Sequence, residues 1–149
     1  MTSDIKSISV IICAYTYKRW EALGDSIRSA LSQEPPVQEV VLVVDHNPGL
    51  EAEARDAFPE VVVVANVGKQ GLSEARNTGL EVARGDVIVF LDDDAAAEPG
   101  CVAAMVRHLV RPGAGGVSAR VVPKWVGEKP QWFPESFLWD VGCSHMGDS

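Results

Sequence analysis

Short apolar runs alternate along the chain with segments of helical periodicity. The apolar runs are rich in β-branched residues and cover 7–13, 39–44, 61–65 and 87–91. Such runs are typical of buried strands, whereas apolar residues that recur every three or four positions between them are typical of helices. The alternation predicts an α/β domain with a mostly parallel sheet, flanked by helices and joined by right-handed crossovers.

Prolines, glycines and capping residues set the expected boundaries of these elements. A helix that follows the first strand ends before Pro35, and a short helix is expected over 51–58. Ser73 is expected to cap the third helix, and Pro99 fits the first position of the fourth. A fifth strand is expected over 116–122.

The chain changes character after this point. Residues 124–139 contain three of the four Trp and two of the four Phe, with two prolines and no clear period. We therefore expect an α/β domain over 1–122 and a Trp/Pro-rich segment over 123–149. An exposed aromatic segment of this kind favours self-association, so a homo-oligomer is expected.

Polar residues follow four of the predicted strands. In open parallel sheets ligands bind beyond the carboxyl ends of the strands, which directs attention to 14–19, 45–47, 66–71 and 92–94. The last of these segments consists of three consecutive aspartates. Neighbouring carboxylates repel one another, and a divalent cation bridging to a diphosphate would relieve that repulsion. The alternative is a solvated acidic turn before a helix, where Asp is also favoured.

Composition and motifs exclude several classes of protein. The net charge of -8 and the scattered basic residues argue against a nucleic-acid partner. A dinucleotide-binding fold and a P-loop both need glycine-rich loops that are absent after the first strand. The three cysteines have no metal-ligand spacing and indicate unpaired thiols in a reducing compartment. The polar N-terminus and short first apolar run favour a cytoplasmic chain. Attachment to the inner membrane face would need a segment outside this sequence.

Three stretches in order resemble the N-terminal half of family 2 glycosyltransferases. They read SVIICAYTYKRWEALGDSIRSALSQ, VVLVVDHNP and GLSEARNTGLEVARGDVIVFLDDDA, and the resemblance runs from residue 7 to about 122. The later KPQWFPESFLWDVGCS resembles a subgroup that acts on lipid-linked sugars, including glucuronosyl transfer to a dolichyl-phosphate sugar. The resemblance implies an incomplete GT-A fold and metal-dependent, inverting transfer from a nucleoside-diphosphate sugar, with a UDP-sugar favoured and Mn2+ or Mg2+ as cofactor. It also implies a saccharide or lipid-linked sugar as acceptor.

The resemblance assigns the first donor-binding residues to two loops. Ala14, Tyr15 and Arg19 match the loop that borders the base and the diphosphate. Asp45 matches an acidic residue that hydrogen-bonds the base, commonly uracil. The chain departs from the family pattern directly after Asp45, where 46–48 read His-Asn-Pro instead of a second acid and a small residue.

The next implied residues lie in the third loop and the helix that follows it. Lys69 and Gly71 match the loop beside the nucleotide, and Arg76 matches a basic helix residue near it. The residue types also allow other interpretations. Lys69 could be a solvated loop charge, Tyr15 could pack in the core, and Arg76 could be a surface helix residue paired with Glu74 or Asp86.

The aspartates complete the implied site. Asp92 and Asp93 match residues that contact the nucleoside and ribose, and Asp94 matches the metal-binding end of the D-x-D motif. The general base of an inverting transferase is expected beyond Ser149, with Asp140 as a remote candidate. These matches predict a truncated transferase with weak or no activity.

Two other function classes stay open from the sequence. One is a non-catalytic nucleotide-sugar-binding or interaction module, which tight donor binding without turnover would favour. The other is a nucleotidyltransferase, which shares the alternating strands and helices and the metal-binding acids. That class usually carries a glycine-rich basic loop after the first strand, and this chain has none there.

Overall fold

The computed structural model of the chain describes residues 7–144. The polar N-terminal residues 1–6 and the last five residues of the expected 123–149 segment lie outside that range. The chain divides into two compact units, Met1–Ala114 and Gly115–Ser149. This division falls before the 122/123 boundary expected from the sequence.

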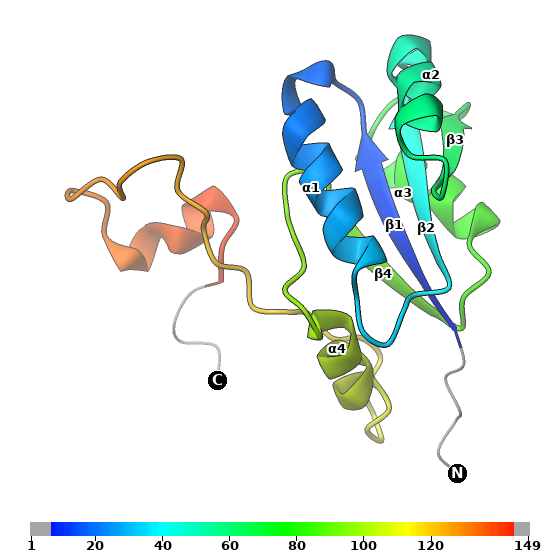
Figure 1. Ribbon diagram of the computed structural model, residues 1–149. Helices are drawn as coiled ribbons and strands as arrows, with labels where there is room; N and C mark the ends of the chain where they lie inside the picture. The colour runs from blue at the N-terminus through cyan, green and yellow to red at the C-terminus, as the bar shows by residue number, and fades with distance from the viewer. Residues whose placement is uncertain (1–6, 145–149) are drawn as a thin grey trace. The chain divides into compact units, whose positions relative to one another are not determined.

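The first unit alternates strands and helices as the sequence pattern predicts (Figure 1). Its strands are β1 (Ile8–Ala14), β2 (Glu39–Asp45), β3 (Val62–Asn66) and β4 (Val87–Asp92). Its helices are η1 (Tyr17–Arg19), α1 (Trp20–Leu31), α2 (Pro48–Ala57), α3 (Leu72–Val82) and α4 (Cys101–Leu109).

All strand pairs are parallel, and the strand order is β3-β2-β1-β4. The chain therefore moves outward from β1 to β3 and then crosses to the other side of β1 to form β4. This reversal makes a switch point between β1 and β4. Crevices at the carboxyl ends of strands on either side of such a point are where parallel sheets bind ligands.

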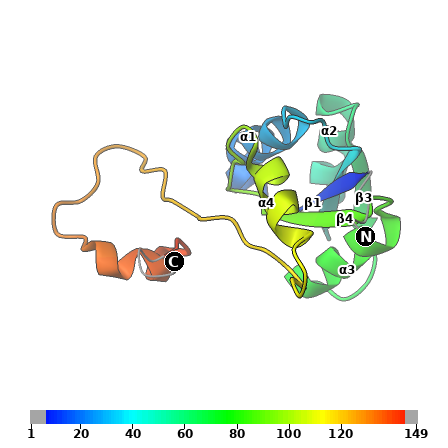
Figure 2. The ribbon, with the colours of Figure 1, turned by 90° about the horizontal axis from the view of Figure 1, so that it is seen from below.

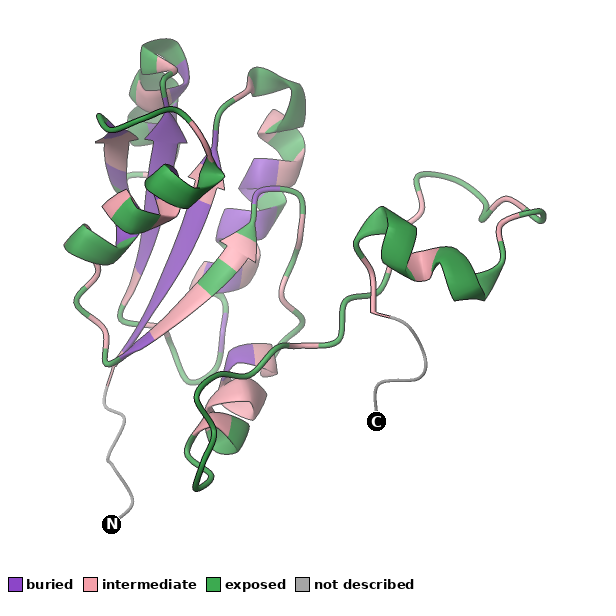
Figure 3. Cartoon of the chain, turned by 180° about the vertical axis from the view of Figure 1, so that it is seen from behind, coloured by how far each residue is buried: buried purple, intermediate pink, exposed green. Residues whose placement is uncertain are grey.

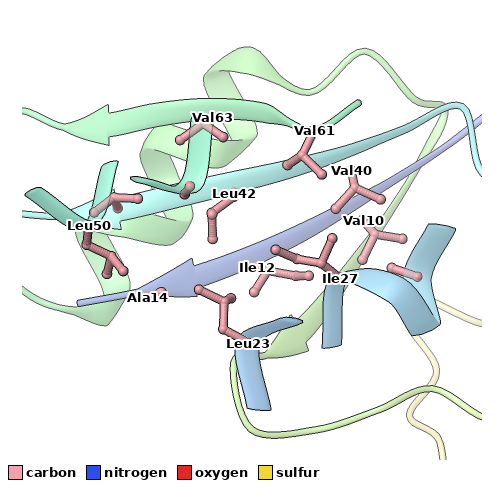
Figure 4. Packing of buried hydrophobic residues seen from close by; sticks show 13 residues of the cluster. Val10, Ile12, Ala14, Leu23, Ile27, Val40, Leu42, Leu50, Val61 and Val63 are labelled. Carbon is pink, nitrogen blue, oxygen red and sulfur yellow. The ribbon is translucent and has the colours of Figure 1, made fainter. Parts of the chain in front are cut away.

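Helices cover both faces of the sheet (Figure 2). Even-numbered residues of β1 and β2, such as Ile12 and Leu42, pack against Leu23 and Ile27 of α1 and Leu50 of α2 in the main core (Figure 4). Odd-numbered residues of the same strands face α3 on the other side. Because β1 and β2 are buried on both faces, they read as continuous apolar runs in the sequence (Figure 3).

The helix α4 packs at the amino ends of β1 and β4. Val102 is buried with Ile8 and Val87, and Met105 and Val106 pack beside them. The apolar spacing of this helix is as the sequence predicts, but the helix begins at Cys101 and not at Pro99. Pro99 instead precedes Gly100, whose φ of 76° ends a turn that only glycine adopts readily.

Other boundaries also differ from the sequence expectation. Helix α2 begins at Pro48, because the Asn47 side chain caps it by accepting a hydrogen bond from the Leu50 amide. Helix α3 begins after Gly71, and Ser73 lies inside its first turn without acting as the cap. A glycine with φ of 139° supplies the entry conformation there in place of a side-chain cap.

The expected strand over 116–122 is absent from the described residues. Val117, Val121 and Val122 are exposed in this segment. Strand propensity reflects the fit of a side chain to a pleated, half-buried surface, and no neighbouring strand offers that surface here. The prediction of a fifth strand is therefore wrong.

The second unit contains one regular element, the 3-10 helix η2 (Glu135–Val141), within its described part. Trp125 and Phe133 meet edge to face with ring centroids 5.3 Å apart, and Trp132 lies 5.9 Å from Phe133. Backbone and hydroxyl hydrogen bonds between Val121 and Ser144 close the unit. Among the described residues no helix is long and apolar enough to cross a membrane.

Candidate functional site

The polar segments singled out in the sequence lie along the carboxyl edge of the sheet. The strand register sets Ala14 beside Val44, Asp45 beside Asn66, and Cys13 beside Asp92. The Asn47 side chain also donates a hydrogen bond of 3.1 Å to the Tyr15 carbonyl, which joins the loops that follow β1 and β2. The expectation that these segments share one edge is confirmed.

Asp45 ends β2 with its carboxylate buried and saturated by donors. Oδ1 accepts hydrogen bonds from Asn66 Nδ2 at 2.6 Å and from His46 Nδ1 at 2.8 Å, and Oδ2 accepts one from the Gly71 amide at 2.9 Å. Burial acts to raise the pKa of Asp45, but the three hydrogen bonds outweigh it and hold the pKa below its ordinary value. Asp45 is therefore a fixed negative charge that organises the loops around it.

Asn66 ends β3 and ties the next loop to Asp45. Its Nδ2 also donates to the Lys69 carbonyl at 3.1 Å. Its Oδ1 accepts from the Gly68 amide and from the Thr78 hydroxyl, both at 3.1 Å. Every hydrogen-bonding position of this amide has a partner within the protein. Such partners are needed because only 3% of the residue is exposed to water.

Arg19 and the aspartates form a second group beyond β1 and β4. Arg19 Nη1 lies 2.8 Å from Asp93 Oδ1 and 3.4 Å from Asp94 Oδ2. Asp93 is only 5% exposed, and its Oδ2 is buried without a hydrogen-bond partner. Burial raises the pKa of Asp93 more than Arg19 lowers it, and the neighbouring aspartates add to the increase.

Asp92 pairs with the helix α3 on the opposite side of this group. Arg76 Nη2 lies 3.3 Å from Asp92 Oδ1, and its guanidinium stands over the Phe90 ring at 5.3 Å from the centroid. The ion pair of Arg76 is thus with the end of β4, whereas the surface alternative offered Glu74 or Asp86. Asp92 therefore pairs with Arg76, whereas Asp93 and Asp94 share Arg19.

Other predicted residues differ in how far they reach the solvent. Tyr15 is 55% exposed, which removes the alternative of core packing, whereas Ala14 is buried at 2% and presents only its backbone to the edge. Lys69 is exposed in a loop. Burial raises the pKa of Cys13 to about 11, against the lowering effect of Arg76, so this half-buried thiol stays protonated at neutral pH.

The helix α1 and the residues directly after it contribute side chains that the sequence reasoning missed. Ser26 donates to the Asp92 carbonyl at 3.0 Å, and Ser29 accepts from the Ala97 amide at 3.0 Å. Gln33 Nε2 donates to the Glu98 carbonyl at 3.1 Å, and its Oε1 accepts from the Val102 amide at 3.1 Å. These hydrogen bonds hold the segment that follows the aspartates against α1 and Gln33. Gln33 also satisfies the Val102 amide in the first turn of α4.

A signal for these residues exists in the sequence but is weak. Ser26, Ser29 and Gln33 are three and four positions apart, which is the spacing of residues on one side of a helix, although α1 itself ends at Leu31. Asn66 is a polar residue at the end of an apolar strand. Each pattern is also common on solvent-exposed surfaces, and only the tertiary contacts distinguish the two cases.

Comparison with known proteins identifies the family. Residues 9–146 match the family model described as glycosyl transferase family 2. The chain belongs to glycosyl transferase family 2. The match covers nearly all of the first unit and extends through the described part of the second.

A curated relative in the same family comes from Haloferax volcanii. This glucosyl-dolichyl phosphate glucuronosyltransferase is 38% identical over 144 residues, which cover 94% of this chain and 46% of the relative. The chain thus spans less than half of that relative's length. Family membership is therefore established, whereas the activity in the relative's name is that of a longer chain.

Two solved structures with bound nucleotide sugars share the fold. Staphylococcus aureus TarS in complex with UDP-GlcNAc has a TM-score of 0.56 and 19% identity, covering 69% of this chain and 31% of that chain. A mannosyltransferase from Pyrobaculum calidifontis in complex with GDP-Man and Mn2+ has a TM-score of 0.56 and 24% identity, covering 69% and 32%. At these identities the likeness shows the fold, which is the glycosyltransferase A type, and this chain contains part of it.

Proposed function

We propose that the carboxyl edge of the sheet is the donor site of a metal-dependent, inverting glycosyltransferase that uses a nucleoside-diphosphate sugar. Family membership supports sugar transfer. The observation that carries the donor site is the unpartnered Oδ2 of Asp93, a buried acceptor beside two further aspartates and Arg19. A buried acceptor without a donor is costly, and a bound ligand with hydroxyl groups would supply the missing donor.

The groups along this edge suit the parts of a nucleoside diphosphate. Tyr15 and the loop containing Lys69 offer an exposed ring and a cation next to Asp45. Arg19 and Arg76 provide two guanidinium groups among the aspartates, and guanidinium groups bind phosphate oxygens in pairs of hydrogen bonds. We assign Ala14, Gly71, Asp92 and Asp93 to the same donor site. UDP is the favoured nucleotide, and GDP is the alternative because solved relatives bind either base.

The residues present fit a divalent cation that shares its ligands with a diphosphate. Asp94 presents a carboxylate whose side chain is 52% exposed, and carboxylate oxygens are the ligands that Mn2+ and Mg2+ favour. Residues 7–144 contain no group of three or more His, Cys, Asp or Glu that would hold a metal by itself. Most of the coordination would thus come from phosphate oxygens and water, as is usual for Mg2+. We assign the metal contact to Asp94.

Inverting transfer is a single displacement at the anomeric carbon by an acceptor hydroxyl. A bound divalent ion supplies charge neutralisation of the departing diphosphate. Arg19 and Arg76 hold that diphosphate in line for the displacement. A carboxylate must accept the proton of the attacking hydroxyl, and the three aspartates are assigned to the donor, so this base is another group.

The acceptor is proposed to be a saccharide or a lipid-linked sugar. The support is the relative from Haloferax volcanii, whose name describes transfer to glucosyl-dolichyl phosphate, and whose likeness extends through the aromatic second unit. A chain acting on such a substrate would work at the cytoplasmic face of a membrane. Exposed Trp side chains in the second unit have the amphipathic character found at membrane interfaces.

The test is calorimetric titration of the chain with UDP and with GDP, each with and without Mn2+. We expect binding that depends on Mn2+ and weakens by about tenfold or more in Asp94→Ala, because one metal ligand is lost. Asp56→Ala removes an exposed acid on α2, outside the site, and is the matched control. Metal-dependent binding that survives in Asp94→Ala would contradict the metal assignment, and absence of binding to both nucleotides would contradict the donor site.

A further inference from the structure

The loop between β3 and α3 owes its shape to polar contacts and not to packing. Residues 67–70 are all exposed, and Val67 is 90% exposed. A four-residue segment with so little buried apolar surface has no hydrophobic reason to keep one conformation. Its order must come from the hydrogen bonds that its backbone makes.

Those hydrogen bonds converge on one buried side chain, Asn66. It binds two adjacent residues within the loop, through the Gly68 amide and the Lys69 carbonyl. It also donates to Asp45 Oδ1, while Asp45 Oδ2 accepts from the Gly71 amide where the loop enters α3. The carboxylate and the amide therefore hold the loop together at three points along its backbone.

The choice of residue follows from these contacts. Asp45 needs a donor and the Lys69 carbonyl needs a donor, while the Gly68 amide and the Thr78 hydroxyl need an acceptor. Among side chains of this size, only an amide offers two donor hydrogens on one atom and two acceptor positions on the other. An aspartate at position 66 would set a second carboxylate against Asp45, and a leucine would remove the hydrogen bond to each of these four groups.

We propose that Asn66 is a positioning residue for donor binding, which couples the Asp45 carboxylate to the loop of residues 67–71. This inference rests on the proposed function, because the loop is assigned to the nucleotide. A loop ordered before the ligand arrives loses less conformational entropy on binding, which raises affinity without a direct contact. All four hydrogen-bonding positions of the Asn66 side chain are taken by protein groups, so its effect on the ligand passes through the loop.

The test compares two positioning variants with a stability control. Asn66→Leu removes all four hydrogen bonds at similar volume, and Thr78→Val removes only the hydroxyl contact to Asn66. Ser9→Ala is the control, because Ser9 is fully buried and its hydroxyl bonds Glu39 and the Gly85 amide at the opposite end of the sheet. It should lower stability by a similar mechanism without affecting the loop.

Two measurements are made on each variant. For Asn66→Leu we expect the Kd for UDP with Mn2+ to rise about tenfold, since buried partners are left unsatisfied and the loop must order on binding. Thr78→Val should show a smaller increase, and Ser9→Ala should stay within about twofold of wild type at equal loss of thermal stability. Hydrogen exchange without nucleotide should become faster at the Gly71 amide in Asn66→Leu but not in Ser9→Ala.

The exchange measurement separates this inference from the proposed function. If the wild-type chain binds neither UDP nor GDP, the donor site fails, while faster exchange at Gly71 still supports coupling through Asn66. Unchanged exchange at Gly71 in Asn66→Leu overturns the inference, since the loop would then keep its order without Asn66. A Kd for Asn66→Leu equal to that of Ser9→Ala overturns it as well, because the effect would be one of general stability.

Discussion

Individual aspartates at the carboxyl edge differ in how their surroundings shift their pKa. Asp45 has three donors and a lowered pKa, whereas Asp93 has one cation, one unpartnered oxygen and a raised pKa. The folded state therefore stabilises the ionised form of Asp45 and disfavours that of Asp93. A ligand with hydrogen-bond donors would supply the partner that Asp93 Oδ2 lacks, whereas Asp45 is satisfied by the protein itself.

The lowered pKa of Asp45 leads to a prediction for stability against pH. Its contribution is present above the ordinary pKa of 3.8 and is lost as the pH falls through the lower folded value. At about pH 7, Asp45→Asn should lower the free energy of unfolding by about 1–3 kcal/mol, because an amide cannot accept all three hydrogen bonds. The difference from wild type should shrink as the pH falls below 3.8.

Urea unfolding of both proteins across this pH range measures the effect. The control is Asp56→Asn, which changes an exposed acid on α2 and should leave the free energy of unfolding within about 0.5 kcal/mol at each pH. A difference between Asp45→Asn and wild type that stays constant down to low pH would show that the charge of Asp45 does not stabilise the fold.

At the scale of elements, the helix α3 approaches the sheet closely at Gly79, whereas a side chain added at Gly24 of α1 would first meet Arg28 of the same helix. A Cβ added at Gly79 of α3 would lie 2.6 Å from Ile11 Cγ2 and 3.2 Å from Val43 Cγ2. A Cβ added at Gly24 of α1 would meet only the Arg28 guanidinium, at 3.1 Å. Both glycines lie within helices, so alanine has the same intrinsic advantage at each and the neighbours decide the outcome.

Alanine substitutions at these two glycines should have opposite effects. Gly79→Ala should lower the free energy of unfolding by about 1–3 kcal/mol, because Ile11 and Val43 are fully packed and cannot move aside. Gly24→Ala should raise it by up to about 1 kcal/mol, since the exposed Arg28 end can shift and alanine favours the helix. Chemical denaturation measures both, and equal effects of the two changes would contradict the close approach of α3.

For the whole molecule, the second unit presents aromatic side chains to solvent. Trp132 is 80% exposed, Trp139 is 62% exposed and Phe137 is 52% exposed. The first unit keeps its large apolar residues mainly between sheet and helices. The aromatic surface of the second unit is thus the part of the chain most suited to contact something else.

The exposed aromatics lead to a prediction of concentration-dependent association. Sedimentation velocity at increasing concentration should show dimers or larger species, because exposed apolar surface is removed from water when copies meet. Trp132→Ser with Trp139→Ser should shift the distribution toward monomer. The matched control is Leu80→Ser, which changes an exposed apolar residue on α3 in the first unit. A monomeric profile of the wild-type chain at all concentrations would contradict self-association through these aromatic side chains.

The sequence by itself determined the order of strands and helices and the edge that carries the site. Both follow from local patterns, because doubly buried strands must be apolar throughout and polar residues at their carboxyl ends must then share one edge. Asp92, Asp93 and Asp94 stand out for this reason in the amino-acid sequence alone. The boundaries of α2 and α4 were less predictable, because Asn47 and Gly100 each fit a turn as well as a helix entry.

Tertiary structure alone decided which side chains meet. Asp45 and Asn66 are 21 residues apart, and Gln33 and Val102 are 69 residues apart, yet each pair is joined by a hydrogen bond. No local propensity reports such partners, since they depend on which strands lie side by side and which helix covers them. The same reason explains why residues 116–122 do not form a strand. Their valines suit a strand, but that conformation buries them only beside a neighbouring strand.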